Sequence, residues 1–196
     1  MMSDIKILVT GVSSQVGSAL CARALSAGVS VVWFDDSILN SLQLESIKAA
    51  IVSFNPSYVV NTASYSVVDL AEDNAQESYV FNHNVAMVLA QSCHELALPL
   101  LHLSTDYVFD GNSKVPYKEN DQTNPQGVYG ETKLKGELAI LCSGCKHIII
   151  RTAWVFSEYG NNFLKTMLRL GAERDELSIV GDQIGCPTYA QDIARS

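Results

Sequence analysis

The stretch Thr-Gly-Val-Ser-Ser-Gln-Val-Gly at residues 10–17 decides the fold. It follows a short apolar run at residues 5–10 and opens a segment whose apolar residues have helical spacing. Such a strand–turn–helix brings backbone N–H groups to a helix N-terminus, where a pyrophosphate binds. Gly11 permits the tight turn and Gly17 the close packing of helix on strand. Ser14 stands where the dinucleotide-binding pattern has a further glycine, and its hydroxyl is a candidate phosphate donor.

The rest of the chain alternates apolar runs with helical patterns. Strands are expected at residues 5–10, 29–34, 58–62, 100–105, 147–156 and 177–180, and helices at 15–27, 42–54, 76–96, 127–142 and 162–174. Continuously apolar strands separated by helices indicate a parallel sheet that is covered on both faces. We therefore predict an α/β, doubly wound parallel sheet of the Rossmann type.

Composition and charge exclude several classes of protein. The chain has 196 residues, 47% of them hydrophobic, which is typical of a folded domain and not of a disordered chain. Its 13 Lys+Arg against 21 Asp+Glu give a net charge of −8, which argues against nucleic acid as a partner. No signal peptide or membrane-spanning run is visible, and the five cysteines are an odd number, so we expect a cytoplasmic protein.

An acidic residue after the second strand adds to the dinucleotide signal. Asp35 lies where a carboxylate accepts hydrogen bonds from the adenosine ribose hydroxyls. Asp36 follows it and no arginine is adjacent, so a 2′-phosphate would be repelled. This pattern favours NADH over NADPH, although an ordinary polar loop accounts for the two aspartates equally well.

Three further residues have the order that carbonyl reduction needs. Thr105 ends the fourth strand, and Tyr129 and Lys133 lie one turn apart on the helix that follows. A tyrosine hydroxyl protonates a developing alkoxide when its pKa is lowered, which a nearby lysine ammonium achieves electrostatically. The threonine hydroxyl holds the carbonyl oxygen. Because ligands bind beyond the carboxyl ends of the strands, the order predicts a reductase site there.

At this point the chain resembles a known family, the extended short-chain dehydrogenase/reductases, and within them the dTDP-4-dehydrorhamnose reductases. The matching segments are residues 59–72, 103–111, 128–137, 151–156, 161–163 and 182–188. The runs STDYVFDG and VYGETKLKGE are the most specific of these.

The resemblance implies NAD(P)H-dependent reduction of the C4 keto group of dTDP-4-dehydro-L-rhamnose to dTDP-L-rhamnose. It implies that Thr105, Tyr129 and Lys133 are catalytic, with Tyr129 as the proton donor. It places the cofactor against Gly11, Ser14, Gln15, Val16, Gly17, Asp35, Ala63, Ser64, Tyr65, Tyr129 and Lys133. Thr105, Asp106 and Trp154 would face the sugar nucleotide.

Other interpretations of these residues stay open. The scaffold also fits another 4-keto reductase or an epimerase of nucleotide sugars, or a non-catalytic regulatory subunit like the beta subunit of methionine adenosyltransferase. Trp154 on an apolar strand is more often a core residue, and Arg151 fits either a diphosphate ligand or a structural ion pair. Cys142 and Cys145 follow a helix in a Ser-Gly turn, which favours structural thiols over a redox or metal pair.

The resemblance also divides the chain. Residues 1–184 are expected to form the dinucleotide-binding domain with the catalytic residues, and residues 185–196 the start of a C-terminal substrate-binding region that is largely absent. We therefore expect cofactor binding with little or no reductase activity from this chain. The resemblance also makes a homodimer an option and implies that magnesium can be used at a subunit interface, but no ligand set for a metal is recognisable here.

Overall fold

A parallel β-sheet forms the centre of the computed structural model, which describes residues 5–34, 38–39 and 41–196. The strands are β1 (Lys6–Thr10), β2 (Ser30–Trp33), β3 (Tyr58–Asn61), β4 (Leu100–Thr105) and β5 (His147–Thr152). Their order in the sheet is β2-β1-β3-β4-β5, and all neighbours pair in parallel. The chain therefore runs outward from β1 in both directions, and the switch point between β1 and β3 is where such folds bind ligands.

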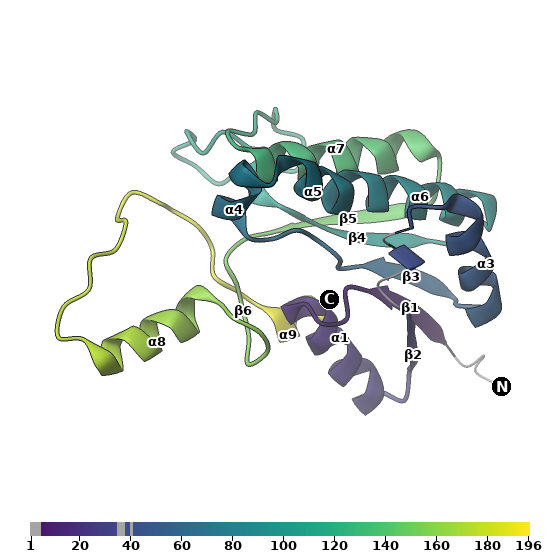
Figure 1. Ribbon diagram of the computed structural model, residues 1–196, viewed down its shortest axis with the longest axis horizontal. Helices are drawn as coiled ribbons and strands as arrows, with labels where there is room; N and C mark the ends of the chain where they lie inside the picture. The colour runs from purple at the N-terminus through teal and green to yellow at the C-terminus, as the bar shows by residue number, and fades with distance from the viewer. Residues whose placement is uncertain (1–4, 35–37, 40) are drawn as a thin grey trace.

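Helices cover both faces of this sheet. The α-helices of the described residues are α1 (Gln15–Ser26), α3 (Leu44–Phe54), α4 (Val68–Asp73), α5 (Ala75–Tyr79), α6 (Val85–Glu95), α7 (Val128–Ser143), α8 (Phe163–Glu173) and α9 (Ala190–Ile193), of which α8 lies away from the sheet. Figure 1 shows α3, α6 and α7 over one face and α1 with α9 over the other. The predicted doubly wound α/β fold is confirmed.

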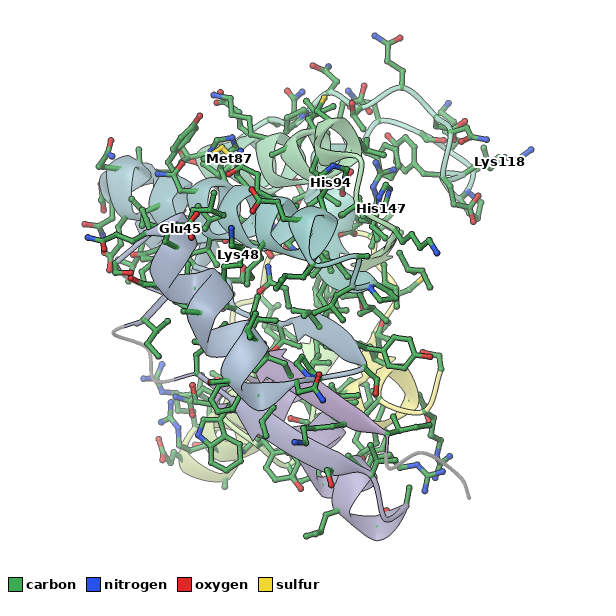
Figure 2. All side chains as sticks on the ribbon, turned by 90° about the vertical axis from the view of Figure 1, so that its right-hand side faces the viewer. Glu45, Lys48, Met87, His94, Lys118 and His147 are labelled. Atoms are coloured by element: carbon green, nitrogen blue, oxygen red, sulfur yellow. The ribbon has the colours of Figure 1, made fainter. Side chains whose placement is uncertain are left out.

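The main core lies between the sheet and the layer of α3, α6 and α7. Its fully buried side chains include Leu8, Ile47, Leu89, Leu100 and Ile140, one from each of β1, α3, α6, β4 and α7. On the outer surface, Lys48 of α3 forms ion pairs with Glu45 of the same helix and Glu95 of α6 (Figure 2). Exposed ion pairs contribute little to stability, so apolar burial holds these helices on the sheet.

The helix expected at residues 76–96 is present, but it is not α-helical throughout. It contains α5, a π-helical turn at Val80–Asn84 and α6. A π-turn inserts one residue into the ladder of helical hydrogen bonds and changes the direction of the side chains around it. Such turns occur near functional sites in many proteins. Here the turn carries Asn82, whose contacts are described below.

Two expectations about strands are wrong. The strand expected at residues 147–156 is interrupted at Ala153 and Trp154, and its second part, β6 (Val155–Phe156), pairs with β7 (Thr188–Tyr189) in a separate two-stranded sheet. No strand forms at residues 177–180, whose Val180 is 67% exposed. That apolar run is four residues long and finds no sheet edge among the described residues, so burial does not stabilise it.

The C-terminal part of the chain packs less tightly than the sheet. None of the residues of α8 is buried, and Figure 1 shows this helix and the following loop extending away from the sheet. The chain then returns through β7 to α9, which packs against α1. Among the described residues, no helix is long and apolar enough to cross a membrane.

Candidate active site

The turn between β1 and α1 packs backbone against backbone. Gly11 has a φ of +68°, and a Cβ atom on it would lie 2.5 Å from the backbone nitrogen of Ala63. A Cβ on Gly17 would overlap the carbonyl oxygen of Gly11 and lie 2.8 Å from Oγ1 of Thr62. Side chains do not fit at either position, so the two glycines bring the turn against the end of β3 and form a shallow backbone cradle at the switch point.

Ser14 uses its hydroxyl inside the protein. It is the N-cap of α1, where its Oγ accepts the N–H of Gly17 at 3.0 Å. Its other contact is Oγ1 of Thr62, also at 3.0 Å. The Thr62 hydroxyl donates its hydrogen to the carbonyl of Thr10 at 2.6 Å. In the bond between the two hydroxyls, Ser14 is therefore the donor and Thr62 the acceptor. In this structure its hydroxyl is therefore engaged and does not point out of the turn as a phosphate donor.

Gln15 and Val16 contribute only backbone groups to the cradle, because their side chains have contacts elsewhere. The side chain of Gln15 accepts hydrogen bonds from Ser157 at 3.0 Å and from Asn162 at 2.9 Å, which ties α1 to the start of α8. The side chain of Val16 is buried in a small cluster with Ala190 of α9. As the first two helical residues, both carry N–H groups that lack an acceptor inside the helix and point out of its N-terminus.

A row of buried polar groups links the ends of three strands. Oγ1 of Thr10 donates to Oδ1 of Asn61 at 2.7 Å, and the same oxygen accepts the N–H of Ala63 at 3.1 Å. The amide nitrogen of Asn61 therefore faces Nδ1 of His102 at 2.9 Å. Since burial and the nearby Lys133 hold the pKa of His102 well below its usual range, this imidazole is neutral. The row fixes Ala63, the first of three candidate cofactor residues that follow β3.

The side chain of Asn82 fixes Ser64 and Tyr65, the other two candidate cofactor residues after β3. Its Oδ1 accepts the hydroxyl of Ser64 and the N–H of Tyr65, both at 2.9 Å. Its Nδ2 donates to the carbonyl of Tyr65 at 3.2 Å and to Oγ1 of Thr132 on α7 at 3.1 Å. Sequence reasoning missed Asn82; the available signal was a polar residue on a helix that is otherwise apolar toward the core. It clamps the loop after β3 onto α7.

Three hydroxyl groups from separate segments meet at the carboxyl ends of β3 and β4. The hydroxyl of Tyr129, on the first turn of α7, lies near the side chains of Thr105 and Ser64, which favour its ionised form. Oγ1 of Thr105 also accepts the N–H of Tyr107 at 3.2 Å and donates to Asp106 at 3.2 Å. The structure thus brings Thr105, Tyr129 and Ser64 together beside the glycine cradle.

Burial determines the charge state of the two residues on α7. Burial raises the pKa of Tyr129, and the contacts with Thr105 and Ser64 oppose it only in part. Nζ of Lys133 donates to the carbonyl oxygen of Leu103 at 2.6 Å, and burial lowers the pKa of Lys133 to about 8. The lowered pKa that we expected for Tyr129 is therefore not found, because the ammonium is directed at the backbone of β4 and desolvation dominates at the phenol.

Trp154 is not a core residue. It lies in the break between β5 and β6 with a φ of +47°, a strained conformation for a bulky residue. Its side chain is 36% exposed and packs edge-to-face on Phe163, with ring centroids 5.5 Å apart. A Cβ on Gly185 would overlap the indole, so this glycine admits the ring.

Asp106, half-buried at the end of β4, has a pKa raised by burial.

Arg151 and the cysteine pair have structural contacts. Arg151 forms a two-pronged ion pair with Glu137 of α7, which favours the ion-pair interpretation over a diphosphate ligand. Cys142 is exposed whereas Cys145 is buried, and both are free thiols. In the part of the chain that the structure describes, no group of three His, Cys, Asp or Glu side chains is placed to hold a metal ion. Asp35 lies outside the described residues.

The comparisons with known proteins agree with this geometry. The family model described as the RmlD substrate binding domain matches residues 5–196. The dTDP-4-dehydrorhamnose reductase of Sinorhizobium fredii is 41% identical over 96% of this chain and 64% of its own length. That of Aggregatibacter actinomycetemcomitans is 43% identical over 96% of this chain and 65% of its own. The chain thus spans less than two thirds of the length of these curated relatives.

Solved structures show the same similarity. A dTDP-4-dehydrorhamnose reductase from Clostridium acetobutylicum superposes with a TM-score of 0.92 at 37% identity, over 97% of this chain and 68% of that one. The Bacillus anthracis enzyme in complex with NADP gives a TM-score of 0.93 at 34% identity, over 98% and 69%. These matches confirm the resemblance seen in the sequence. The chain therefore belongs to the RmlD substrate binding domain family, together with proteins named dTDP-4-dehydrorhamnose reductases.

Proposed function

We propose that this chain carries the cofactor-binding and proton-donating residues of a reductase that converts dTDP-4-dehydro-L-rhamnose to dTDP-L-rhamnose. The observation that carries the proposal is the meeting of Ser64, Thr105 and Tyr129 beside the Gly11–Gly17 cradle. A hydride acceptor and its proton donor must lie together at the nicotinamide end of a dinucleotide site, and these residues lie at that edge of the sheet.

The residues of the cradle fit a nicotinamide dinucleotide. A side chain on Gly11 or Gly17 would fill the space against the end of β3, and the N–H groups of Gln15 and Val16 point out of the start of α1. Ala63, Ser64 and Tyr65 follow β3 and border the same region. When bound, NADH or NADPH supplies the hydride for C4 of the sugar. The aspartates after β2 favour NADH, whereas the Bacillus anthracis relative binds NADP.

The chain's own side chains supply the proton and the orientation. Tyr129 holds its proton at neutral pH, because burial raises its pKa, and donates it to the alkoxide that forms at C4. Thr105 presents its hydroxyl to the same oxygen and fixes its position. Lys133 lies one turn from Tyr129 on α7 and would hold the nicotinamide ribose of a bound cofactor through its ammonium. Asp106 and the exposed ring of Trp154 border the sugar.

The proposal also covers the domain division, the cellular location and the oligomeric state of the protein. We infer a dinucleotide-binding domain at residues 1–184 and the start of a substrate region at 185–196 from the resemblance of the sequence to the family. The free cysteines support a cytoplasmic location. The unburied apolar side chains of α8, such as Leu168, support a homodimer.

Two measurements test the proposal. Fluorescence titration of this chain with NADH and NADPH reports cofactor binding directly. Oxidation of the cofactor on addition of dTDP-4-dehydro-L-rhamnose, generated in situ, reports the reaction, and it uses the protein expressed from the complete gene. We expect Tyr129→Phe to lower turnover by about 10²-fold or more with cofactor binding retained. Tyr58→Phe, at an exposed tyrosine on β3, is the control. Cofactor binding without any sugar-dependent oxidation would exclude this reaction.

A further inference from the structure

The helix that carries Tyr129 begins at a residue without a side chain. The N-cap of α7 is Gly127, so this position supplies no side-chain acceptor of its own. The first N–H groups of a helix lack partners inside it, and an N-cap side chain normally accepts one of them. Here the acceptor comes from another helix, because Oε1 of Glu72, on α4, accepts the N–H of Val128 at 2.8 Å.

Gly127 allows the carboxylate to come this close. A Cβ atom on Gly127 would lie 2.8 Å from Oε1 of Glu72. The helix α4 packs against α7 (Figure 1), and it follows the loop that carries Ser64 and Tyr65. The bond therefore joins the segment after β3 to the residue that directly precedes Tyr129.

Other contacts hold the rest of the first turn of α7. A Cβ on Gly130 would overlap the carbonyl oxygen of Tyr107, so the turn lies directly on the 3-10 turn that follows β4. The ring of Tyr107 meets the ring of Tyr129 edge-to-face, with centroids 5.7 Å apart. The hydroxyl of Thr132 donates to the carbonyl of Tyr129 at 3.0 Å. These contacts fix one side and the carbonyl end of the turn, and the Glu72 carboxylate fixes its N–H end.

We propose that Glu72 is a positioning residue for Tyr129: its carboxylate caps α7 from α4 and holds the turn that carries the phenol against Tyr107. The consequence for the reaction rests on the proposed function, whereas the effect on the position of Tyr129 does not. A proton donor must lie within hydrogen-bond reach of the atom that it protonates, so a shift of this turn lowers turnover even when the cofactor still binds.

The first test reads the position of Tyr129 in this chain, without cofactor or sugar. In Glu72→Ala we expect hydrogen exchange of the Val128 N–H to become about fivefold faster or more, because its acceptor is lost. The NMR cross-relaxation between the rings of Tyr107 and Tyr129, assigned with Tyr129→Phe, should weaken. Glu72→Gln keeps an oxygen that accepts the same N–H, and it should stay close to the wild type in both measurements.

The neighbouring acid on α4 offers a matched control. Asp73 is the next residue and is also exposed, and Asp73→Ala leaves the bond from Val128 to Glu72 in place. It should match the wild type in both measurements. Circular dichroism checks that each variant is folded.

The second test uses the protein expressed from the complete gene. In Glu72→Ala, kcat should fall about fivefold while the Kd of NADH and the KM of the sugar stay near the wild-type values, since Tyr129 acts in the transition state. Glu72→Gln should recover most of this loss. A general loss of structure would weaken binding as well, which the split between kcat and KM detects.

The outcomes separate this proposal from the proposed function. Unchanged exchange and ring contact in Glu72→Ala overturn the positioning role, as does faster exchange with the ring contact of Tyr129 intact. Glu72→Gln behaving like Glu72→Ala also overturns it, because the acceptor oxygen would not be the cause. An unchanged kcat despite a lost ring contact overturns the role in the reaction. A lost ring contact in Glu72→Ala, together with no sugar-dependent oxidation by the wild type, supports the role of Glu72 and counts against the proposed function alone.

Discussion

Oδ1 of Asn82 accepts the backbone N–H of Tyr65 at 2.9 Å, which fixes the loop after β3 to the π-turn that precedes α6. Asn82 is 1% exposed, and its amide also bonds to Thr132 and Ser78. Both ends of the amide are thus satisfied, and the contacts link three segments of the site.

We expect Asn82→Leu to lower the free energy of unfolding by about 3 kcal/mol, because several buried polar groups lose their partner at once. NADH affinity should fall as well, since the loop carrying Ser64 loses its anchor. Urea denaturation and fluorescence titration measure the two effects. The control is Asn74→Ala, at an exposed asparagine that bonds only locally to Leu70. Equal stability of the two variants would contradict this account.

Replacing the N-cap of α1 should change stability more than cofactor binding. Ser14→Ala removes the acceptor for the N–H of Gly17 and should lower the free energy of unfolding by about 1 kcal/mol. Ser14→Gly should lower it by only a few tenths of a kcal/mol. Affinity for NADH should stay within about threefold in both, because the backbone N–H groups remain. A large loss of affinity in Ser14→Ala at normal stability would show instead that the hydroxyl binds phosphate.

The glycine cradle offers a matched pair of substitutions. Gly17→Ala places a Cβ against the carbonyl oxygen of Gly11, and we expect it to cost about 1–3 kcal/mol of stability and to weaken NADH binding about tenfold or more. Gly171→Ala, on α8, meets no atom within 4 Å and should leave NADH binding unchanged. Isothermal titration calorimetry of both variants measures the NADH affinity. Tight NADH binding by Gly17→Ala would show that the cradle is not part of the cofactor site.

The choice between the two cofactors is testable at Asp35. If its carboxylate accepts hydrogen bonds from the ribose, Asp35→Ala should weaken NADH binding more than NADPH binding, because the 2′-phosphate is no longer repelled. Parallel fluorescence titrations with the two cofactors measure the ratio. An equal loss for both would show that this carboxylate does not contact the ribose.

Stability at high pH should depend on Cys93. Burial raises the pKa of this thiol to about 12, so the folded chain keeps a proton that the unfolded chain loses near pH 9. This contribution to stability is complete below pH 9 and is lost as the pH rises toward 12, by up to about 1.4 kcal/mol per pH unit. Urea denaturation at pH 8, 9 and 10 should show a shallower fall in Cys93→Ala. Cys142→Ala, at an exposed thiol, should follow the wild type.

The five strands of the central sheet could be predicted from the sequence, including the short strands β2 and β3, whereas residues 177–180 do not form the predicted strand. The strands at residues 5–10 and 100–105 are confirmed because their patterns are continuous and bounded by turns. The run Leu-Ser-Ile-Val at residues 177–180 is also largely apolar, but it has no neighbouring strand edge to pair with among the described residues. Strand formation depends on a neighbouring strand, and the sequence does not show which distant segments become neighbours in the fold.

The sequence by itself determined the doubly wound sheet, the glycine turn and the order of Thr105, Tyr129 and Lys133. Local propensity and helical spacing specify such features, because they depend on residues close together in the chain. Only the tertiary structure decided what these residues contact. It turned the Ser14 hydroxyl inward, placed Asn82 beside the site, paired Glu137 with Arg151, and directed Lys133 at the backbone of β4. Such contacts, and the pKa values that burial sets, arise between segments far apart in sequence, where desolvation and packing outweigh local pattern.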